Sequence, residues 1–259
     1  FDFDANYTPD TVTQNWYSMQ FNTSFAEGPK LLASLATYDG SDPASLRFRS
    51  YGGKQRWVKV EEDTTSGSEV GHATEKVAYL AIEGEGVLFG GGVGLPGGSE
   101  SSVMGEVGQA RVSDATTTVF LQRPYVNPVV FALPPAFSGN QPVAVRIGNI
   151  QSDRFTMYLR EPVNLDGGHG AEDVNYMVLE AGTWELSNGT VLEVGTVDTA
   201  ATVGPAIANV WETVSLNSSF SAAPVVLSHI QSPGGAPFLK TRMRNQSSSN
   251  FDVALEKQE

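Results

Sequence analysis

The sequence predicts an all-β protein, organised as tandem antiparallel β-sandwich units, two complete and one incomplete. Three observations predict this fold class. The 259 residues include 27 Gly and 14 Pro, a composition that favours short strands joined by tight turns. Alternation of apolar and polar residues recurs along the chain, whereas few stretches have helical periodicity. Similar segments also return about every hundred residues, which indicates a duplication.

The repeat is clearest in landmarks that keep a nearly constant spacing. Pro29, Pro128 and Pro224 stand 99 and 96 positions apart. The pattern His-x-x-Glu-x-x-x-Tyr-x-x-x-Glu occurs twice, 97 positions apart. We interpret the residues that follow each His as a structural motif of the repeat: Glu75, Tyr79 and Glu83 after His72, and Glu172, Tyr176 and Glu180 after His169.

Strand periodicity appears in two forms within each unit. RWVKVEE, RFTMYLRE and NFDVALEK alternate apolar and polar residues, which predicts strands with one buried face. PKLLASL, PVVFAL and PVVLSHI are more continuously apolar and predict strands buried on both faces. A complete unit therefore holds about six strands in two layers. Tryptophans at repeat positions are expected in the core: Trp16 with Trp211, and Trp57 with Phe155 and Phe251.

These patterns divide the chain into six segments. Asn188-Gly189, between alternating apolar residues, predicts a type I′ hairpin, and the Gly-rich segment before the second unit predicts a mobile connector or a loose hairpin. The expected segments are an N-terminal extension (1–11), sandwich repeat 1 (12–86), the Gly-rich connector (87–112), sandwich repeat 2 (113–182), the hairpin connector (183–208) and incomplete repeat 3 (209–259).

Charge and composition exclude several classes of function. The net charge of −13 disfavours nucleic acid and anionic membranes as partners. The chain has no cysteine, so disulfides and thiol chemistry are excluded. No apolar run approaches the roughly 18 residues that span a bilayer, which predicts no membrane insertion. Because the sequence opens at Phe1 without a leader, we expect a mature product or a piece of a larger protein, located outside the cell or at its surface.

The order of aromatic residues and prolines is similar to a known family. Trp16, Phe21, Phe25 and Pro29 precede an apolar strand, and Trp211, Leu216, Phe220 and Pro224 repeat the pattern. Together with the closing strands VAYLAIEGEG and VNYMVLEAG, it resembles the H-type lectin domain, and more closely the tandem H-type-lectin-like repeats of large bacterial secreted or cell-surface proteins. The resemblance covers nearly the whole chain apart from residues 1–11 and the connectors. It implies a six-stranded antiparallel sandwich, trimeric in many members, that binds galactose-type or N-acetylgalactosamine sugars at subunit edges.

The same resemblance implies a carbohydrate site built from an Arg, a His and an Asp. At the counterpart of Asp42, the second unit has Gln141. The third unit offers Arg242 and Arg244, but it ends before any counterpart of His72 and His169. Trp184 lies outside the repeat and is either an aromatic platform for a sugar ring or part of the packed hairpin. The carbohydrate-binding candidates are Asp39, Asp42, Arg47, Arg49, His72, Arg146, His169 and Trp184.

Other chemistry has weaker support in the sequence. The pairs His72–Glu75 and His169–Glu172 suit either a ligand or a structural role, and we favour the structural one. The acidic runs suit solvated loops or calcium, but no calcium-binding motif accompanies them, so we expect no cofactor and no metal site. No nucleophile elbow, phosphate-binding loop or His-Glu-x-x-His motif is present, and we expect no enzymatic activity.

These observations favour an extracellular, non-enzymatic carbohydrate-binding module that attaches to glycans or polysaccharide and self-associates as a trimer or a fibre. The alternative is a structural spacer of an adhesin or a filament subunit. In that alternative, FDFDANY within residues 1–11 is a candidate donor strand for the incomplete third unit. A third interpretation is a non-catalytic appendage of a secreted polysaccharide-degrading enzyme.

Overall fold

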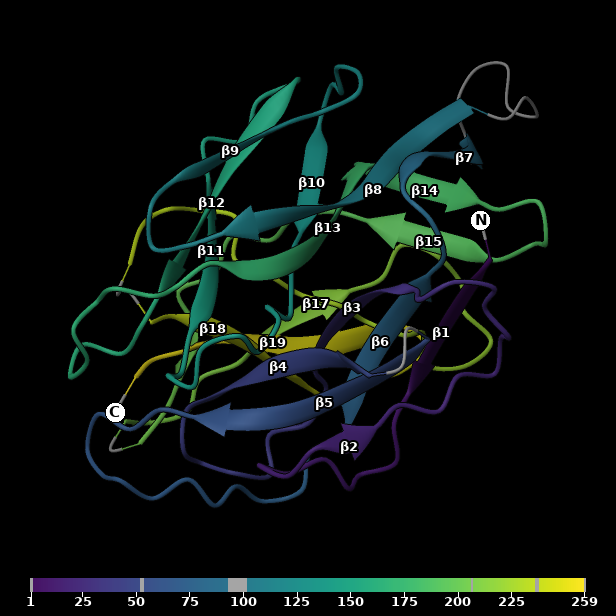
Figure 1. Cartoon of the computed structure of the whole chain (residues 1–259). Helices are drawn as coiled ribbons and strands as arrows, with labels where there is room; N and C mark the ends of the chain where they lie inside the picture. Colours follow the sequence, from purple (N-terminus) through teal and green to yellow (C-terminus); the bar gives the residue numbers. More distant parts are fainter. Residues whose placement is uncertain (1, 52–53, 93–101, 206, 236–237, 259) are drawn as a thin grey trace.

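The computed structural model describes residues 2–51, 54–92, 102–205, 207–235 and 238–258, and within them the protein is all-β (Figure 1). The predicted fold class is therefore confirmed. The strands form antiparallel sheets, apart from one short parallel pair in the third unit.

The first unit is a sandwich of two three-stranded sheets. One sheet has the order β1 (Phe3–Tyr7), β6 (Val77–Ile82), β3 (Lys30–Leu35), and the other has the order β2 (Tyr17–Ser18), β5 (Gln55–Glu62), β4 (Ala44–Tyr51). Residues such as Leu31, Phe48 and Val60 fill the core between them. The expectation that residues 1–11 are an extension outside the first unit is wrong, because β1 pairs with β6 along its whole length.

The second unit repeats this order strand for strand. Its sheets are β8 (Ser102–Val112), β13 (Glu172–Glu180), β10 (Pro128–Phe131), and β9 (Thr117–Phe120), β12 (Arg154–Arg160), β11 (Ala144–Gly148). The predicted connector 87–112 therefore contains the first strand of this unit, β8. It also contains most of β7 (Gly86–Gly92), which pairs with β8 as the other arm of a hairpin. Residues 93–101, the Gly-rich part of that connector, lie outside the described residues.

The predicted hairpin after the second unit is confirmed, but its turn differs. Strands β14 (Gly182–Glu185) and β15 (Val191–Val194) pair antiparallel, and β14 also pairs with β7. The Gly189 N–H donates to the Leu186 carbonyl at 2.8 Å, and Gly189 has a φ of 81°. Asn188 is not among the described residues with positive φ, which a type I′ turn requires at both central positions. The turn is therefore a three-residue loop that closes on a left-handed glycine.

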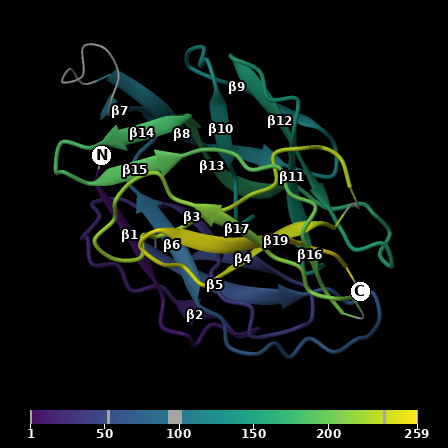
Figure 2. The same cartoon turned by 180° about the vertical axis from the view of Figure 1, so that it is seen from behind.

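The third unit has one of the two sheets of the sandwich (Figure 2). It consists of β17 (Glu212–Ser215), β19 (Asn250–Glu256) and β18 (Lys240–Arg244), with β16 (Thr202–Val203) parallel to β19. Residues 224–230, predicted as a strand, form none. In the other units the corresponding strand pairs with β6 or β13, and the described residues of the third unit contain no counterpart of that partner.

Trp57 does not share the position of Phe155, as their spacing suggested. Strand pairing aligns Val58 with Met157, so that Arg56 is the counterpart of Phe155. Because side chains alternate between the two faces of a strand, a slip of one residue moves a side chain from the core to the other face. The match by residue type was therefore one position out of register.

The consequence is visible in the burial of these side chains. Phe155 is fully buried, whereas Trp57 and Phe251 are only half-buried. Arg56 takes the inward position in the first unit, and its Nε donates to the Pro29 carbonyl at 2.9 Å. The expected core role holds for Phe155, while Phe251 packs at the margin of the core of the third unit.

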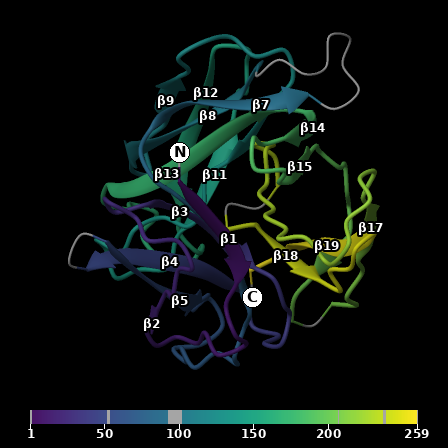
Figure 3. The ribbon, with the colours of Figure 1, turned by 90° about the vertical axis from the view of Figure 1, so that its right-hand side faces the viewer.

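The three units surround a common centre, as the purple-blue, teal and yellow-green parts of the ribbon show (Figure 3). Leu32, Phe131 and Leu227 each stand three residues after a repeat proline, and all three pack in one apolar cluster. The Ala33 N–H of the first unit donates to the Leu133 carbonyl of the second unit at 3.0 Å. One chain thus folds into a ring of three units.

Candidate functional site at the contacts between units

Three arginines at equivalent positions form the centre of the contacts between units. Arg47 on β4, Arg146 on β11 and Arg242 on β18 have exposed fractions of 0%, 2% and 0%. They head the group of the largest fully buried side chains among the described residues. A charge is tolerated at such depth only when hydrogen bonds and opposite charges compensate it.

Arg47 joins the first unit to the second. Its Nη1 donates to Glu61 of the same unit at 2.7 Å, and its Nη2 donates to Glu172 of the second unit at 2.8 Å. The Ala136 carbonyl accepts from Nε at 2.9 Å, and the Gln141 carbonyl accepts from Nη1 at 3.0 Å. The guanidinium is therefore held by two carboxylates and by a loop of the neighbouring unit.

Arg242 joins the third unit to the first in the same way. Its Nη1 donates to Glu256 of its own unit at 2.8 Å, as Arg47 donates to Glu61. Its Nη2 donates to the Thr37 carbonyl at 3.1 Å and to the Glu75 carboxylate of the first unit. Burial opposes the charge of Arg242, but Glu256 and Glu75 outweigh it and raise the pKa of the guanidinium.

Arg146 joins the second unit to the third through main-chain carbonyls. Its Nη2 donates to Ser232 at 3.2 Å and to Gly234 at 2.6 Å. Burial lowers the pKa of Arg146, and Arg160 adds to this effect. The three arginines link the first unit to the second, the second to the third, and the third to the first, so the ring is closed.

Each complete unit places its histidine between two carboxylates. His72 Nδ1 lies 2.6 Å from Glu62, and its Nε2 lies 3.1 Å from Glu75. Burial disfavours the charged ring, but the hydrogen bonds to Glu75 and Glu62 outweigh it and raise the pKa of His72. In the second unit, His169 lies between Glu161 and Glu172 at 2.8 and 3.1 Å, and its pKa is raised in the same way. Both histidines are buried, which fits the structural role favoured from the sequence.

The Glu of the His-x-x-Glu motif also fixes a loop. Glu75 accepts the N–H groups of Asp39 and Gly40, each at 3.3 Å, and Glu172 accepts the corresponding groups of Ser138 and Gly139 at 2.7 Å. Burial raises the pKa of Glu75, but the bonds from His72, Arg242 and the loop outweigh it and lower the pKa to about 2. The carboxylate therefore stays charged inside the protein.

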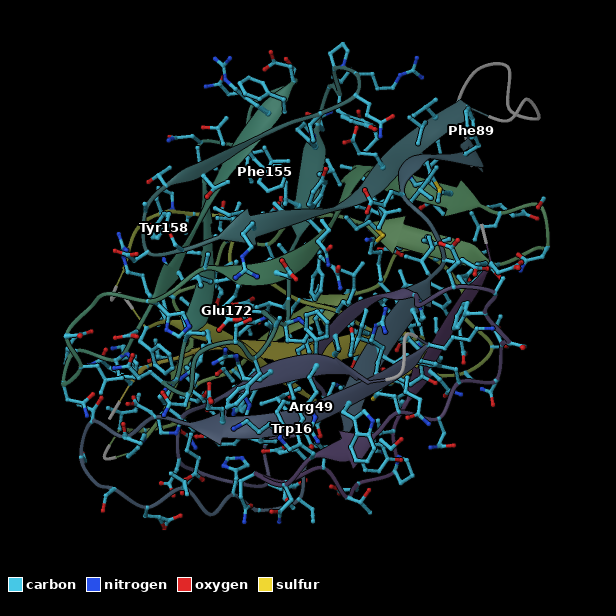
Figure 4. The ribbon with its side chains drawn as sticks, viewed as in Figure 1. Trp16, Arg49, Phe89, Phe155, Tyr158 and Glu172 are labelled. Atoms are coloured by element: carbon cyan, nitrogen blue, oxygen red, sulfur yellow. The ribbon has the colours of Figure 1, made fainter. Side chains whose placement is uncertain are left out.

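Aromatic side chains reinforce two of the contacts. Trp16 meets Phe137 of the second unit edge-on, with 5.3 Å between ring centroids, and the Arg49 guanidinium lies 4.3 Å from the Trp16 ring (Figure 4). Trp211 meets Tyr38 of the first unit at 5.4 Å in the same manner. The two tryptophans are half-buried between units, so the expectation that they fill the core of their own sandwich is wrong.

The other residues of the repeat motif hold the unit itself together. The Tyr79 hydroxyl donates to the Gln20 carbonyl at 3.2 Å. Glu180 accepts the Val126 N–H at 2.7 Å in the turn before β10, and Glu83 accepts the Glu27 N–H in the turn before β3. Tyr176 contributes to the core of the second unit.

The predicted carbohydrate residues are not brought together at one open surface. Arg47, Arg146, His72 and His169 are buried in the contacts described above. Trp184 has an exposed fraction of 4%, and its Nε1 donates to the Glu180 carbonyl at 2.9 Å, so it packs the hairpin. Asp39 is exposed, while Arg49 and Asp42 are half-buried.

Asp42 lines an open acidic pocket of about 130 Å³. Its other lining residues are Glu62, Asp63, Ser66, Gly67 and Glu69. Burial raises the pKa of Glu62, against the effect of His72. Among the described residues, no three His, Asp or Glu side chains are grouped so that they hold a metal ion. The described part of the chain also contains no helix that is long and apolar enough to cross a membrane.

Sequence reasoning missed the carboxylates that share the buried arginines. Glu61 follows Arg47 by 14 positions, and Glu256 follows Arg242 by the same number, so the spacing could have indicated the pairing. The second unit breaks it, because Arg160 stands at that position. The spacing alone did not reveal that these charges are buried between units.

The fold and these contacts define a class: a single chain of tandem antiparallel sandwich units joined by buried ion pairs. A scan against models of protein families gives no match, and no solved structure matches the chain. The chain is similar to halomucin of Haloquadratum walsbyi, with 31% identity over 147 residues. The match covers 54% of this chain and 2% of the length of halomucin.

Proposed function

We propose that this chain is a non-enzymatic structural module of an extracellular surface protein, in which two sandwich units and a third, incomplete unit are locked into one rigid body. The observation that carries the proposal is that most of the candidate sugar-binding side chains are buried in contacts within the protein. Arg47, Arg146, His72 and His169 are buried and bonded within or between units rather than presented to solvent. Buried, bonded side chains of this kind hold the units in one fixed arrangement, and a rigid arrangement suits a spacer.

Two further observations support a surface location. The similarity to halomucin supports membership of a large surface protein, although the chain spans only 2% of that relative. The net charge of −13 suits a soluble exterior and disfavours nucleic acid as a partner. We also propose that the two complete units are H-type-lectin-like repeats, and the shared order of their six strands supports this.

Calorimetry tests the rigid-body part of the proposal. If the units are locked together, the full chain unfolds in one transition whose calorimetric and van't Hoff enthalpies agree. Separate transitions for the units would show independent beads and contradict the proposal. Labelling of intact cells with an antibody to the chain tests the location, and labelling that requires lysis would contradict it.

Carbohydrate binding is the second candidate function, and the acidic pocket favours it. Carboxylates of Asp42 and Glu69 in an open pocket offer acceptors for sugar hydroxyls. A glycan array tests this candidate, with Asp42→Asn as the matched variant. Binding by the original chain that the variant loses would support a lectin. No binding above background would reject carbohydrate binding and leave the structural function as the remaining candidate.

A further inference from the structure

We propose that the third unit binds an extended polypeptide segment that resembles β6 and β13, by strand addition between β15 and residues 224–230. This inference goes beyond the proposed function and depends on other residues. In both complete units, β6 or β13 lies between two neighbouring strands, in the orders β1-β6-β3 and β8-β13-β10. The third unit supplies the two outer members of that sheet.

Strand β15 holds the place of β1 and β8. It follows β14 in a hairpin, as β8 follows β7. Its Glu193 accepts the N–H of Asn217, just after β17, at 2.9 Å. Asp4 of β1 and Glu106 of β8 accept N–H groups just after β2 and β9 in the same way. Among the described residues β15 pairs only with β14, so its second edge carries no strand.

Residues 224–230 hold the place of β3 and β10. Leu227 packs with Leu32 and Phe131, its equivalents in the other two units. Val226 is buried against Met243 of β18, within the core of the third unit. The segment is therefore positioned as an outer strand, although it has no strand partner within the described residues.

The backbone of this segment has one edge in use and one edge without partners. The Val226 N–H donates to the Tyr7 hydroxyl of the first unit at 3.3 Å. In an extended segment, alternate residues direct their backbone groups to opposite edges, so those of Val225 and Leu227 point away from Tyr7. Within the described residues, these groups of Val225 and Leu227 form no hydrogen bond. Such an edge is a template for a further strand.

The core of the third unit is also less covered than its counterparts. Phe155 is fully buried in the second unit, but its equivalent Phe251 is half-buried. Tyr125 has an exposed fraction of 5%, whereas its equivalent Phe220 is half-buried. An added strand would cover the same apolar surface that β6 and β13 cover in the complete units.

The charge of Arg146 beside the open sheet indicates which residue the added strand carries at its start. In the complete units, the Glu at or just before the start of the closing strand, Glu172 or Glu75, meets an arginine of the preceding unit in the ring. Arg146 reaches the Ser232 and Gly234 carbonyls of the third unit, as Arg47 reaches the carbonyls of the second. The first Glu of an added strand would therefore arrive beside Arg146.

The occupant is accordingly a segment with the pattern Glu-x-x-x-Tyr-x-x-x-Glu and apolar residues between. Its Tyr would face Glu193, as the Tyr79 hydroxyl lies 3.4 Å from Asp4 in the first unit. The N-terminal FDFDANY does not fit this role, because β1 is already paired with β6 in its own unit.

A peptide with the sequence of residues 169–181, HGAEDVNYMVLEA, tests the proposal when it is added to the full chain. We expect saturable binding of one peptide per chain by isothermal titration calorimetry. Hydrogen exchange should slow in residues 191–194 and 224–230. A peptide carrying Glu172→Gln should bind about tenfold more weakly, because it loses a charge-assisted bond to Arg146. A scrambled peptide serves as the control.

Three results would overturn the proposal. The first is no binding at a peptide concentration of about 1 mM, a weak limit for a specific contact. The second is protection from exchange at sites other than β15 and residues 224–230. The third is self-association of the chain through these two segments, measured by light scattering, that the peptide does not reverse. That result would assign the open sheet to a second copy of the chain.

Discussion

Arg242 and Glu75 stand 167 positions apart in the chain, yet the guanidinium of one donates to the carboxylate of the other with both side chains fully buried. This contact brings the third unit back to the first. Because Arg47 and Glu172 form the equivalent contact between the first unit and the second, the sequence repeat produces a repeated interface.

Replacement of Arg47 by Met should strongly destabilise the protein. The change removes the buried guanidinium that Glu61 and Glu172 share, and leaves Glu61 with Lys59 and Glu172 with His169. Loss of one partner from a buried ion pair costs about 3–5 kcal/mol, which urea unfolding measures directly. Arg154→Met is the matched control, since the Arg154 side chain is 43% exposed and lies 4.0 Å from Asp153. The control should change the free energy of unfolding by less than about 1 kcal/mol, and an equal effect of the two variants would contradict the account.

Replacement of Gly40 by Ala should disturb the loop that Glu75 fixes. An added Cβ would lie 2.5 Å from Cε1 of the buried His72 ring, so either the ring or the loop must move. Overpacking of this kind costs about 1–3 kcal/mol. Gly170→Ala is the control, because no atom lies within 4 Å of its added Cβ. Thermal unfolding compares the two variants, and a Gly40→Ala protein as stable as the control would refute the close packing.

Stability should be greatest between about pH 4.5 and pH 6.5, the ordinary pKa values of the Glu and His groups concerned. The pKa of Glu75 is lowered from 4.5 to about 2, so its stabilisation is present above pH 4.5 and is lost as the pH falls through the folded value. The pKa values of His72 and His169 are raised from 6.5, so their stabilisation is present below pH 6.5 and is lost as the pH rises through the folded values.

Urea unfolding at pH 3, 6 and 9 measures this dependence. The double variant His72→Gln with His169→Gln should lose the alkaline decline and keep most of the acid one. Burial lowers the pKa of Lys240 to about 8, so its loss of charge above pH 8 favours the folded state and opposes the alkaline decline. Because Lys240 is present in both proteins, this effect does not alter the comparison. A variant that keeps the full alkaline decline would contradict the role given to the two histidines.

The sequence was sufficient for the fold class and for most strands of the complete units. Alternation identified β5, β12 and β19, because one face of each strand meets a core. Alternation did not identify the first strand of either complete unit, because the sequences of β1 and β8 are almost entirely different. Their similarity lies in the hydrogen bonds of Asp4 and Glu106, which accept equivalent backbone N–H groups. Residues 224–230 were predicted as a strand from their apolar character, but a strand also needs a partner.

The candidate site was predictable only in part. The nearly equal spacing of Arg47, Arg146 and Arg242 could be read from the sequence, but charged residues are usually exposed, so their burial could not. Their burial depends on loops that lie far away in the chain, such as the one around Ala136. Contacts between units of a ring are not encoded in the periodicity of any one unit.

A double-mutant cycle on Arg242 and Glu75 tests the closed ring most directly. The original chain, Arg242→Met, Glu75→Gln and the double variant are unfolded in urea under the same conditions. We predict a coupling energy of about 1–3 kcal/mol, as for side chains that share one buried network. A coupling energy within about 0.3 kcal/mol of zero would mean that the third unit does not meet the first, and would contradict the ring.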